Sequence, residues 1–334
     1  MSPSRSSAAG RYEADRVVVL RPLGLGDFLT GLPAYRGIRR YFTSAEILLA
    51  CPLALEPLAA LSGVFDGVVD TRPLTPLSER LCGLDVAINL HGRGSDSTQV
   101  LLDAGARRVI AFSTPQLPQT AGMARWRADE HEVHRWCRLL ESAGIDCDPD
   151  ELDLPVPPVA VPAFAHGATL IHPGAASESR RWPPERWSAV IAAERAAGRE
   201  VILTGGPAES ALTAGIARAT GLPPGRVFAG ETSLVELAAL VLASGRVVCG
   251  DTGVAHVATA YRKPSVTLFG PTPPGTWGPP ANRPYHRILW AGMRGDPHGN
   301  EVDPGLLRIA VDDVLAALAT LGDPRPLTVA PADR

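Results

Sequence analysis

The sequence lacks the features that mark membrane, secreted and zinc-binding proteins. No apolar run reaches the length of a membrane span, and Ser, Ala and Gly stand where an export signal would have a basic start and an apolar core. The five cysteines are odd in number, scattered, and form no C-x-x-C pair. We therefore expect a cytoplasmic protein with reduced thiols and no bound metal.

An excess of charge of one sign is also missing. The 334 residues carry a formal net charge of −3, with 45% hydrophobic and 20% charged residues, so the composition does not indicate a nucleic-acid partner. A chain of this length suits two domains of about 150 residues, each with its own core. The composition predicts an ordinary soluble protein of two domains.

Three common nucleotide and hydrolase motifs are absent. The turn at Leu23–Asp27 has only the first two glycines of the dinucleotide fingerprint, and no acidic residue about 20 positions later ends a second strand. Neither a G-x-x-x-x-G-K-[ST] loop nor a G-x-S-x-G elbow occurs. His131–His134 (HEVH) lacks the spacing of the zinc motif and is predicted to be a solvated helix face. A nicotinamide cofactor is therefore not expected.

What the chain does contain is an alternation of short apolar runs and helical stretches on both sides of a proline-rich segment. Residues 147–165 have the sequence CDPDELDLPVPPVAVPAFA, which favours an extended connector. The predicted strands are Arg16–Leu20, Ala45–Ala50, Val64–Asp70, Leu84–Asn89, Arg108–Ala111, Thr169–His172, Glu200–Thr204, Arg246–Cys249 and Ser265–Phe269. The predicted helices are Phe28–Tyr41, Leu53–Leu61, Glu132–Ala143, Pro184–Ala197, Ala208–Thr220 and Leu234–Ala243. This alternation predicts two mostly parallel sheets, whose ligands bind beyond the carboxyl ends of the strands.

These elements give a prediction of domain organisation. A disordered tail is expected at 1–12, an N-terminal domain at 13–150 and a proline-rich linker at 151–165. A C-terminal domain is expected at 166–308, and a final helix at 309–322 is expected to pack back across the seam.

The stretch Gly250–Ala260 (GDTGVAHVATA) carries the strongest indication of a ligand. It lies between two apolar runs and predicts a strand end, a glycine-bearing turn and a helix start. The free N–H groups of a first helical turn and the positive end of the helix dipole favour an anion. With the glycine turn at Leu23–Asp27, this predicts a nucleotide-phosphate ligand shared between the two halves of the chain.

Four loops have, in chain order, the sequences LGLGDFLTGLPAYRGIR, LIHPGAASESRRWPPERW, VILTGGPAE and VVCGDTGVAHVATAYRKPSVTLFGPTPPGTWGP. Together they resemble glycosyltransferase family 9, the ADP-heptose:lipopolysaccharide heptosyltransferase-like enzymes, and the resemblance spans about Arg16 to Leu321. It implies an α/β fold of the GT-B type, two Rossmann-like parallel-sheet domains facing a central cleft. It also implies an inverting, metal-independent glycosyltransferase that uses a nucleoside-diphosphate sugar such as ADP-heptose and needs no cofactor.

The resemblance also implies the central residues of the site. Asp27 matches the aspartate after the family's first glycine turn and is expected to take the proton of the acceptor hydroxyl. Its alternative role is to cap a helix beginning at Phe28, which would lower its pKa and make it a poorer base. Arg180 stands where the family usually has a lysine and is expected to stabilise the leaving diphosphate, a task that Arg181 could share. The alternative for both arginines is a solvated surface.

The other candidate residues follow predicted strands. His256 either touches phosphate or is a core residue, and Asp251 either caps a helix or orients a sugar hydroxyl. The remaining candidates are Gly26, Gly205, Gly206, Thr252 and Gly253 for the donor phosphates, Glu209 or Glu231 for the ribose, and His91, Arg93 and Ser95 for the acceptor, where ordinary loop polarity is the alternative.

The sequence leaves the acceptor and the membrane position open. The acceptor is a glycan, a lipid-linked molecule or a small molecule, and the family's use of lipid-linked acceptors implies a peripheral position at the inner membrane face. The chain shows no polybasic amphipathic helix that would support membrane binding. The alternative functions are a nucleotide-sugar epimerase or hydrolase of the same fold, and a non-catalytic nucleotide-sugar binding protein.

Overall fold

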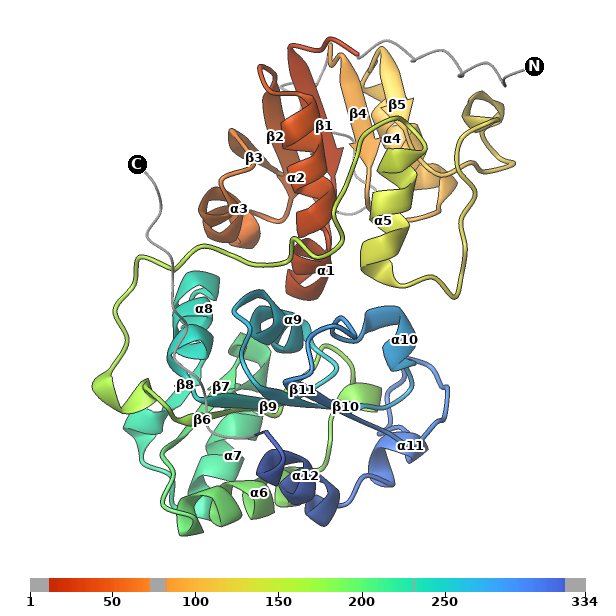
Figure 1. Cartoon of the computed structure of the whole chain (residues 1–334). Helices are drawn as coiled ribbons and strands as arrows, with labels where there is room; N and C mark the ends of the chain where they lie inside the picture. The colour runs from red at the N-terminus through yellow and green to blue at the C-terminus, as the bar shows by residue number, and fades with distance from the viewer. Residues whose placement is uncertain (1–11, 73–80, 82, 231, 322–334) are drawn as a thin grey trace, which may run out of the picture. The chain divides into compact units, whose positions relative to one another are not determined.

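A parallel β-sheet forms the centre of each half of the chain (Figure 1). The computed structural model describes residues 12–72, 81, 83–230 and 232–321. The contacts divide the chain into an N-terminal unit, residues 1–152, and a C-terminal unit, residues 153–334. The division falls within the proline-rich segment 151–165.

The N-terminal unit has the strand order β3-β2-β1-β4-β5, with parallel neighbours throughout. Its elements are β1 (Arg16–Leu20), α1 (Leu25–Thr30), α2 (Leu32–Tyr41), β2 (Glu46–Cys51), α3 (Glu56–Ser62), β3 (Gly67–Asp70), β4 (Val86–Asn89), α4 (Ser95–Asp103), β5 (Arg108–Ile110) and α5 (Glu132–Glu141). After Arg16, strand β1 is apolar and buried to its end because helices cover both faces of the sheet (Figure 1). Strands β2 and β3 lie on one side of β1 in the sheet, and β4 and β5 lie on the other. In sheets of this kind ligands bind where the strand order reverses, which is at the carboxyl ends of β1 and β4.

The C-terminal unit has the order β11-β10-β9-β6-β7-β8, also parallel. Its strands are β6 (Thr169–His172), β7 (Val201–Gly205), β8 (Val227–Ala229), β9 (Arg246–Gly250), β10 (Ser265–Phe269) and β11 (His286–Trp290). Its helices are α6 (Pro184–Ala196), α7 (Ser210–Thr220), α8 (Leu234–Ala243), α9 (Gly253–Ala260), α10 (Pro274–Trp277), α11 (Pro304–Leu307) and α12 (Val311–Ala319). The equivalent crevice lies at the carboxyl ends of β6 and β9.

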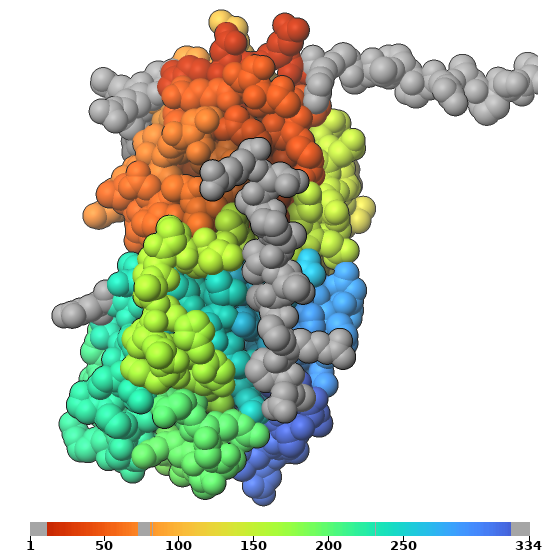
Figure 2. All heavy atoms as spheres, turned by 60° about the vertical axis from the view of Figure 1, so that its left-hand side comes forward, coloured from red at the N-terminus to blue at the C-terminus, as the bar shows by residue number. Residues whose placement is uncertain are grey.

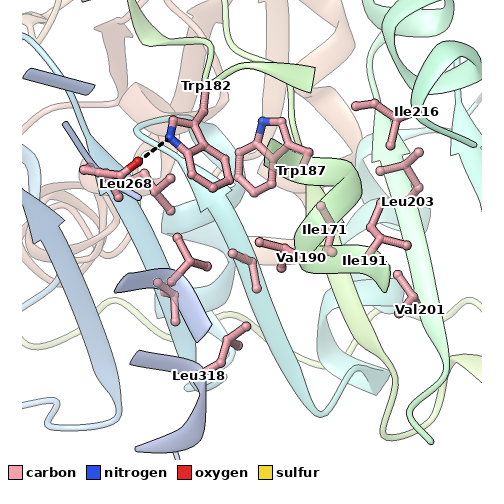
Figure 3. Packing of buried hydrophobic residues seen from close by; sticks show 14 of the residues in the cluster. Ile171, Trp182, Trp187, Val190, Ile191, Val201, Leu203, Ile216, Leu268 and Leu318 are labelled. Carbon is pink, nitrogen blue, oxygen red and sulfur yellow. Dashed lines mark hydrogen bonds between the residues drawn. The ribbon is translucent and has the colours of Figure 1, made fainter. Parts of the chain in front are cut away.

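Two tryptophans form the centre of the C-terminal core (Figure 3). The rings of Trp182 and Trp187 pack edge to face at 5.0 Å, and both side chains are fully buried. The indole N–H of Trp182 donates to the Ile309 carbonyl at 3.1 Å. Val314 and Leu318 of α12 belong to the same cluster, and α12 packs against α6, β10 and β11. The packing of this helix across the seam stays a prediction.

Replacing Trp182 by Phe is expected to destabilise the protein by about 1 kcal/mol, because the Ile309 carbonyl loses one of its two donors while it keeps the other, Arg186, and most of the apolar contact is kept. Urea unfolding followed by tryptophan fluorescence measures the effect, with Trp277→Phe, at a half-buried position, as the matched control. Equal midpoints for the two variants would show that the hydrogen bond contributes nothing.

The start of the linker is held on the C-terminal unit. Leu154 donates its N–H to the Ala260 carbonyl at 3.2 Å, and the Asp153 carboxylate pairs with Arg262 at 2.5 Å and Arg283 at 3.0 Å. Figure 2 shows the yellow-green linker residues lying against the surface of that unit. An extended segment of this composition can therefore be ordered by a few polar contacts rather than by a core of its own.

The structure confirms several predicted elements and corrects others. The strands at 16–20, 169–172 and 265–269 and the helix at 234–243 have the predicted bounds. The single helix predicted at Phe28–Tyr41 is wrong, because α1 begins at Leu25 and a second helix, α2, begins at Leu32. Pro33 causes the break, since it has no N–H to donate to the preceding turn. The short strands β8 and β11 and the helix α4 were not predicted.

Candidate active site

Asp27 lies in the first turn of α1, beyond the carboxyl end of β1. Gly24 is the N-cap of this helix, Gly26 precedes Asp27 in the first turn, and the Asp27 carboxylate accepts a hydrogen bond from the Gly24 backbone. The predicted alternative had the wrong helix start: α1 begins at Leu25, and Asp27 caps it from the third position, through the N-cap backbone, rather than from the N-cap itself. The Asp27 side chain is 28% exposed, so a ligand can reach its carboxylate.

A buried arginine that was not predicted holds Asp27 in place. Arg21, the residue directly after β1, is 1% exposed, and its Nε donates to the Asp27 carbonyl at 2.7 Å. Its Nη1 donates to the Leu90 carbonyl and its Nη2 to Thr30 Oγ1 at 3.2 Å. The distance from Nη2 to the Asp27 carboxylate is 3.9 Å. One guanidinium thus joins α1 to the ends of β1 and β4.

The surroundings of Asp27 raise the pKa of its carboxyl group. Burial is the largest cause, the positive charge of Arg21 opposes it, and the negative charge of Glu132 adds to it. A carboxylate whose pKa is raised is a stronger proton acceptor when ionised. The hydrogen bond from the Gly24 backbone lowers the pKa, as capping does, but burial outweighs it.

Glu132 corrects the prediction that His131–His134 is a solvated helix face. The Glu132 side chain is buried, pairs with Arg21 at 3.2 Å and accepts from the Trp136 indole at 2.7 Å. His131 is the N-cap of α5, and its Nδ1 accepts from the Val133 N–H at 3.3 Å. Within the residues that the structure describes, no group of three His, Cys, Asp or Glu is arranged to hold a metal ion.

The predicted acceptor residues follow β4, the strand beside β1. His91 is half-buried, its N–H donates to Asn89 Oδ1 at 2.9 Å, and its pKa is lowered first by burial and then by the charge of Arg21. Arg93 is exposed, and Ser95 begins α4. The structure therefore brings His91 into the surroundings of Arg21, with Arg93 and Ser95 farther along the same loop.

Arg180 lies at the N-terminal end of α9, as the anion-site prediction requires. Its Nη1 donates to the Asp251 carbonyl at 3.2 Å, and its buried Nε has no hydrogen-bond partner among the described residues. The close approach depends on Gly250, where a Cβ would lie 3.1 Å from the Arg180 carbonyl. Burial raises the pKa of the Asp251 carboxyl, and the charge of Arg180 opposes this shift. A cation therefore lies beside the start of α9.

The first turn of α9 is not covered by a side-chain cap. Thr252 is the N-cap in extended conformation without a side-chain cap hydrogen bond, and Thr252 and Gly253 are half-exposed. Asp251 precedes the cap, so its predicted capping role is wrong. His256 is half-exposed and its ring lies 5.9 Å from that of Trp277, so it is not a core residue. The N-terminus of the eight-residue helix α9, the positive end of its dipole, thus lies beside Arg180.

Arg181 is engaged within its own loop. Its Nε donates to the Ala175 carbonyl at 2.8 Å and its Nη1 pairs with Glu178. These contacts leave Arg180 as the better candidate for a ligand cation.

Glu209 lies at the carboxyl ends of β6 and β7. The Gly206 N–H, one residue after Gly205 ends β7, donates to Glu209 Oε2 at 2.7 Å, and His172 Nε2 lies 3.6 Å from the same oxygen. The Glu209 carboxylate occupies the space that a side chain at Gly174 would fill. The other ribose candidate, Glu231, lies outside the described residues.

Replacing Gly174 by Ala is expected to move the Glu209 carboxylate, because the new Cβ would lie 1.9 Å from its Oε1. If Glu209 binds ribose, the affinity for ADP falls by about tenfold, the scale of one hydrogen bond to a charged group. Calorimetry measures the loss, with Gly215→Ala, where a Cβ meets open space, as the control. Unchanged affinity in both Gly174→Ala and Glu209→Ala would remove Glu209 from the site.

Two parallel-sheet α/β units, each with polar groups at the carboxyl ends of its central strands, agree with the GT-B class that the resemblance implies. One unit carries a carboxylate of raised pKa, and the other carries an arginine at an uncapped helix N-terminus.

Comparison with known proteins gives the family. The model of glycosyltransferase family 9 (heptosyltransferase) matches residues 85–294. Lipopolysaccharide heptosyltransferase 1 of Salmonella typhimurium is 31% identical over 303 residues, which cover 79% of this chain and 90% of that protein. The chain belongs to glycosyltransferase family 9, as predicted.

Other matches are shorter or more distant. Lipopolysaccharide heptosyltransferase 3 of Escherichia coli is 34% identical over 158 residues, and the match spans 46% of each protein, about half of that relative's length. The structure of E. coli ADP-heptose lipopolysaccharide heptosyltransferase II matches with a TM-score of 0.71 at 21% identity, covering 92% of this chain and 98% of that one. This likeness confirms the predicted fold class.

Proposed function

We propose that the chain transfers heptose from ADP-heptose to a hydroxyl group of a glycan, lipid-linked or small-molecule acceptor, with inversion and without a metal. The observation that carries this proposal is Asp27, a reachable carboxylate of raised pKa fixed by a buried arginine at a switch point. ADP-heptose is proposed as the donor because the similar proteins are lipopolysaccharide heptosyltransferases, one of them an ADP-heptose enzyme.

The acceptor step needs a base. The acceptor oxygen attacks the anomeric carbon, its proton passes to the Asp27 carboxylate, and the bond from that carbon to the diphosphate oxygen breaks. A single displacement of this kind inverts the configuration at the carbon. His91, half-buried beside Arg21, is proposed to orient the acceptor hydroxyl.

The donor step needs positive charge, because the leaving ADP gains negative charge as the bond breaks. Arg180 and the N–H groups at the start of α9 are proposed to bind the diphosphate and to stabilise this charge. Glu209, held by the Gly206 N–H, is proposed to accept hydrogen bonds from the ribose hydroxyls.

Incubation with ADP-heptose and a panel of acceptors tests the proposal, with ADP release and the anomeric proton signals of the product followed by NMR. We expect acceptor-dependent ADP release, a product of inverted configuration, and rates unchanged by EDTA. ADP release to water alone would indicate a hydrolase, an altered donor sugar an epimerase, and binding without turnover a binding protein.

A peripheral membrane position on the cytoplasmic side is a separate part of the proposal. Among the described residues, no helix is both long and apolar enough to cross a bilayer. Sedimentation with anionic vesicles, with and without a lipid-linked acceptor, tests the association, and protein that stays in the supernatant in both cases would contradict it.

A further inference from the structure

Glu132 forms a buried charge cluster with two arginines. Its Oε1 lies 3.2 Å from Arg21 Nη2, and its Oε2 pairs with Nη1 of Arg135. All three side chains are about nine-tenths buried or more, and the Trp136 indole also donates to Glu132 at 2.7 Å. Arg21 is the cation that also lies 3.9 Å from the Asp27 carboxylate. Two carboxylates therefore compete for one buried guanidinium.

We propose that Glu132 is a positioning residue, which holds the guanidinium of Arg21 away from a close ion pair with Asp27 and so keeps the Asp27 carboxylate available as a proton acceptor. The geometry supports this assignment, because Nη2 is closer to Glu132 than to Asp27. The importance of Glu132 for catalysis rests on the proposed function, but its electrostatic effect on Asp27 does not.

The sign of the effect follows from the groups that face Asp27. Arg21 at the end of β1 lowers the pKa of Asp27, and Glu132 on α5 raises it. Tyr35 on α2 has a pKa raised by burial and is neutral, and His91 after β4 has a lowered pKa and is also neutral at pH 7. Removing the charge of Glu132 leaves burial as the one remaining cause among these that raises the pKa against the charge of Arg21, so the pKa of Asp27 falls and its carboxylate becomes a weaker base.

The test is an NMR titration of the Asp27 carboxyl carbon in the full chain labelled with ¹³C-aspartate, with Asp27→Asn to assign the signal. In Glu132→Gln we expect the midpoint to move to lower pH by about half a unit or more. The control is Glu130→Gln, which removes a carboxylate that pairs with Arg138 at 2.6 Å just before α5, and its midpoint should match the wild type. An unmoved midpoint in Glu132→Gln would overturn the proposal.

A second variant covers the case in which Glu132→Gln does not fold, since removing one partner of a buried cluster is costly. Glu132→Asp keeps the charge and withdraws it by one carbon, so its midpoint should shift in the same direction by a smaller amount. A midpoint that stays at the wild-type value, or rises, in Glu132→Asp would overturn the proposal.

The pH dependence of transfer tests whether the effect of Glu132 on Asp27 matters for catalysis. With a working transfer assay, Glu132→Gln should shift the acid limb of the kcat/KM profile to lower pH and reduce its plateau about three- to tenfold. A purely structural role would lower the rate without moving the limb, and would overturn the proposal. If the titration shifts but no transfer is found with any acceptor, the proposed function fails while the assignment of Glu132 stands.

Discussion

Asp27→Asn is expected to lower kcat/KM for transfer by about 10²–10⁴-fold, the range for loss of a general base. The amide has nearly the same shape as the carboxylate and keeps the backbone contacts of Arg21, but it cannot take a proton from the acceptor. Steady-state kinetics of ADP release measures the loss, and calorimetry with ADP should show nearly unchanged affinity. A rate within threefold of wild type would contradict the role of Asp27.

The pH dependence of the wild type should report the same group. Because the pKa of Asp27 is raised, kcat/KM should begin to fall, as pH is lowered, above the usual range of an aspartate. Asp27→Asn should remove this limb from the residual activity.

The melting temperature of Asp27→Asn shows whether the substitution unfolds the protein. A raised carboxyl pKa contributes stability that is present at low pH and is lost as pH rises through that pKa. Asp27→Asn should therefore have a melting temperature equal to or above that of wild type at pH 8. A marked fall would mean that the loss of activity comes from unfolding.

Arg180→Ala is expected to lower kcat/KM by about 10²–10³-fold, the scale of one charge-stabilising group at a leaving anion. The guanidinium lies at the start of α9, so its charge can add to that of the helix N-terminus at a bound diphosphate. Kinetics, together with the affinity for ADP, measures the loss. Arg180→Lys should recover part of the activity, since it keeps the charge without the planar fork.

The neighbouring arginine is the matched control for Arg180. Arg181 is held by Ala175 and Glu178, so Arg181→Ala should cost less than tenfold in kcat/KM. Equal losses in the two variants would indicate a general effect of charge in the loop rather than a specific site. The melting temperature with ADP, UDP and GDP provides a further readout, because a ligand that binds Arg180 should shift wild type more than Arg180→Ala.

Local patterns were enough to predict the parallel sheets and the position of Asp27 and Arg180 after strand ends. The mostly apolar runs at 16–20, 169–172 and 265–269 indicated their strands, because a strand covered by helices on both faces buries nearly every side chain. The start of α1 was missed because glycine is a weak helix signal, although Gly24 forms the cap. Strand β8 is only three residues long, too short for any periodicity to show.

Arg21 and Glu132 could not be predicted in the same way. A charged residue is usually exposed, and each of these two is buried among partners that include the other, 111 positions away in the sequence. An arginine directly after the apolar run RVVVL was the one local signal that could have been followed. Glu132 lies in a polar sequence, so its burial depends on tertiary contacts that no local pattern contains.

That separation along the chain has a consequence during synthesis on the ribosome. Arg21 emerges early, but its principal counter-charge belongs to α5, the last helix of the N-terminal unit. Until α5 docks, burying the guanidinium at the end of β1 would be opposed by its desolvation. The proton-accepting site should therefore mature only after about residue 141 has left the exit tunnel, so a nascent chain that stops short of α5 should have the polar groups of the site without their final arrangement.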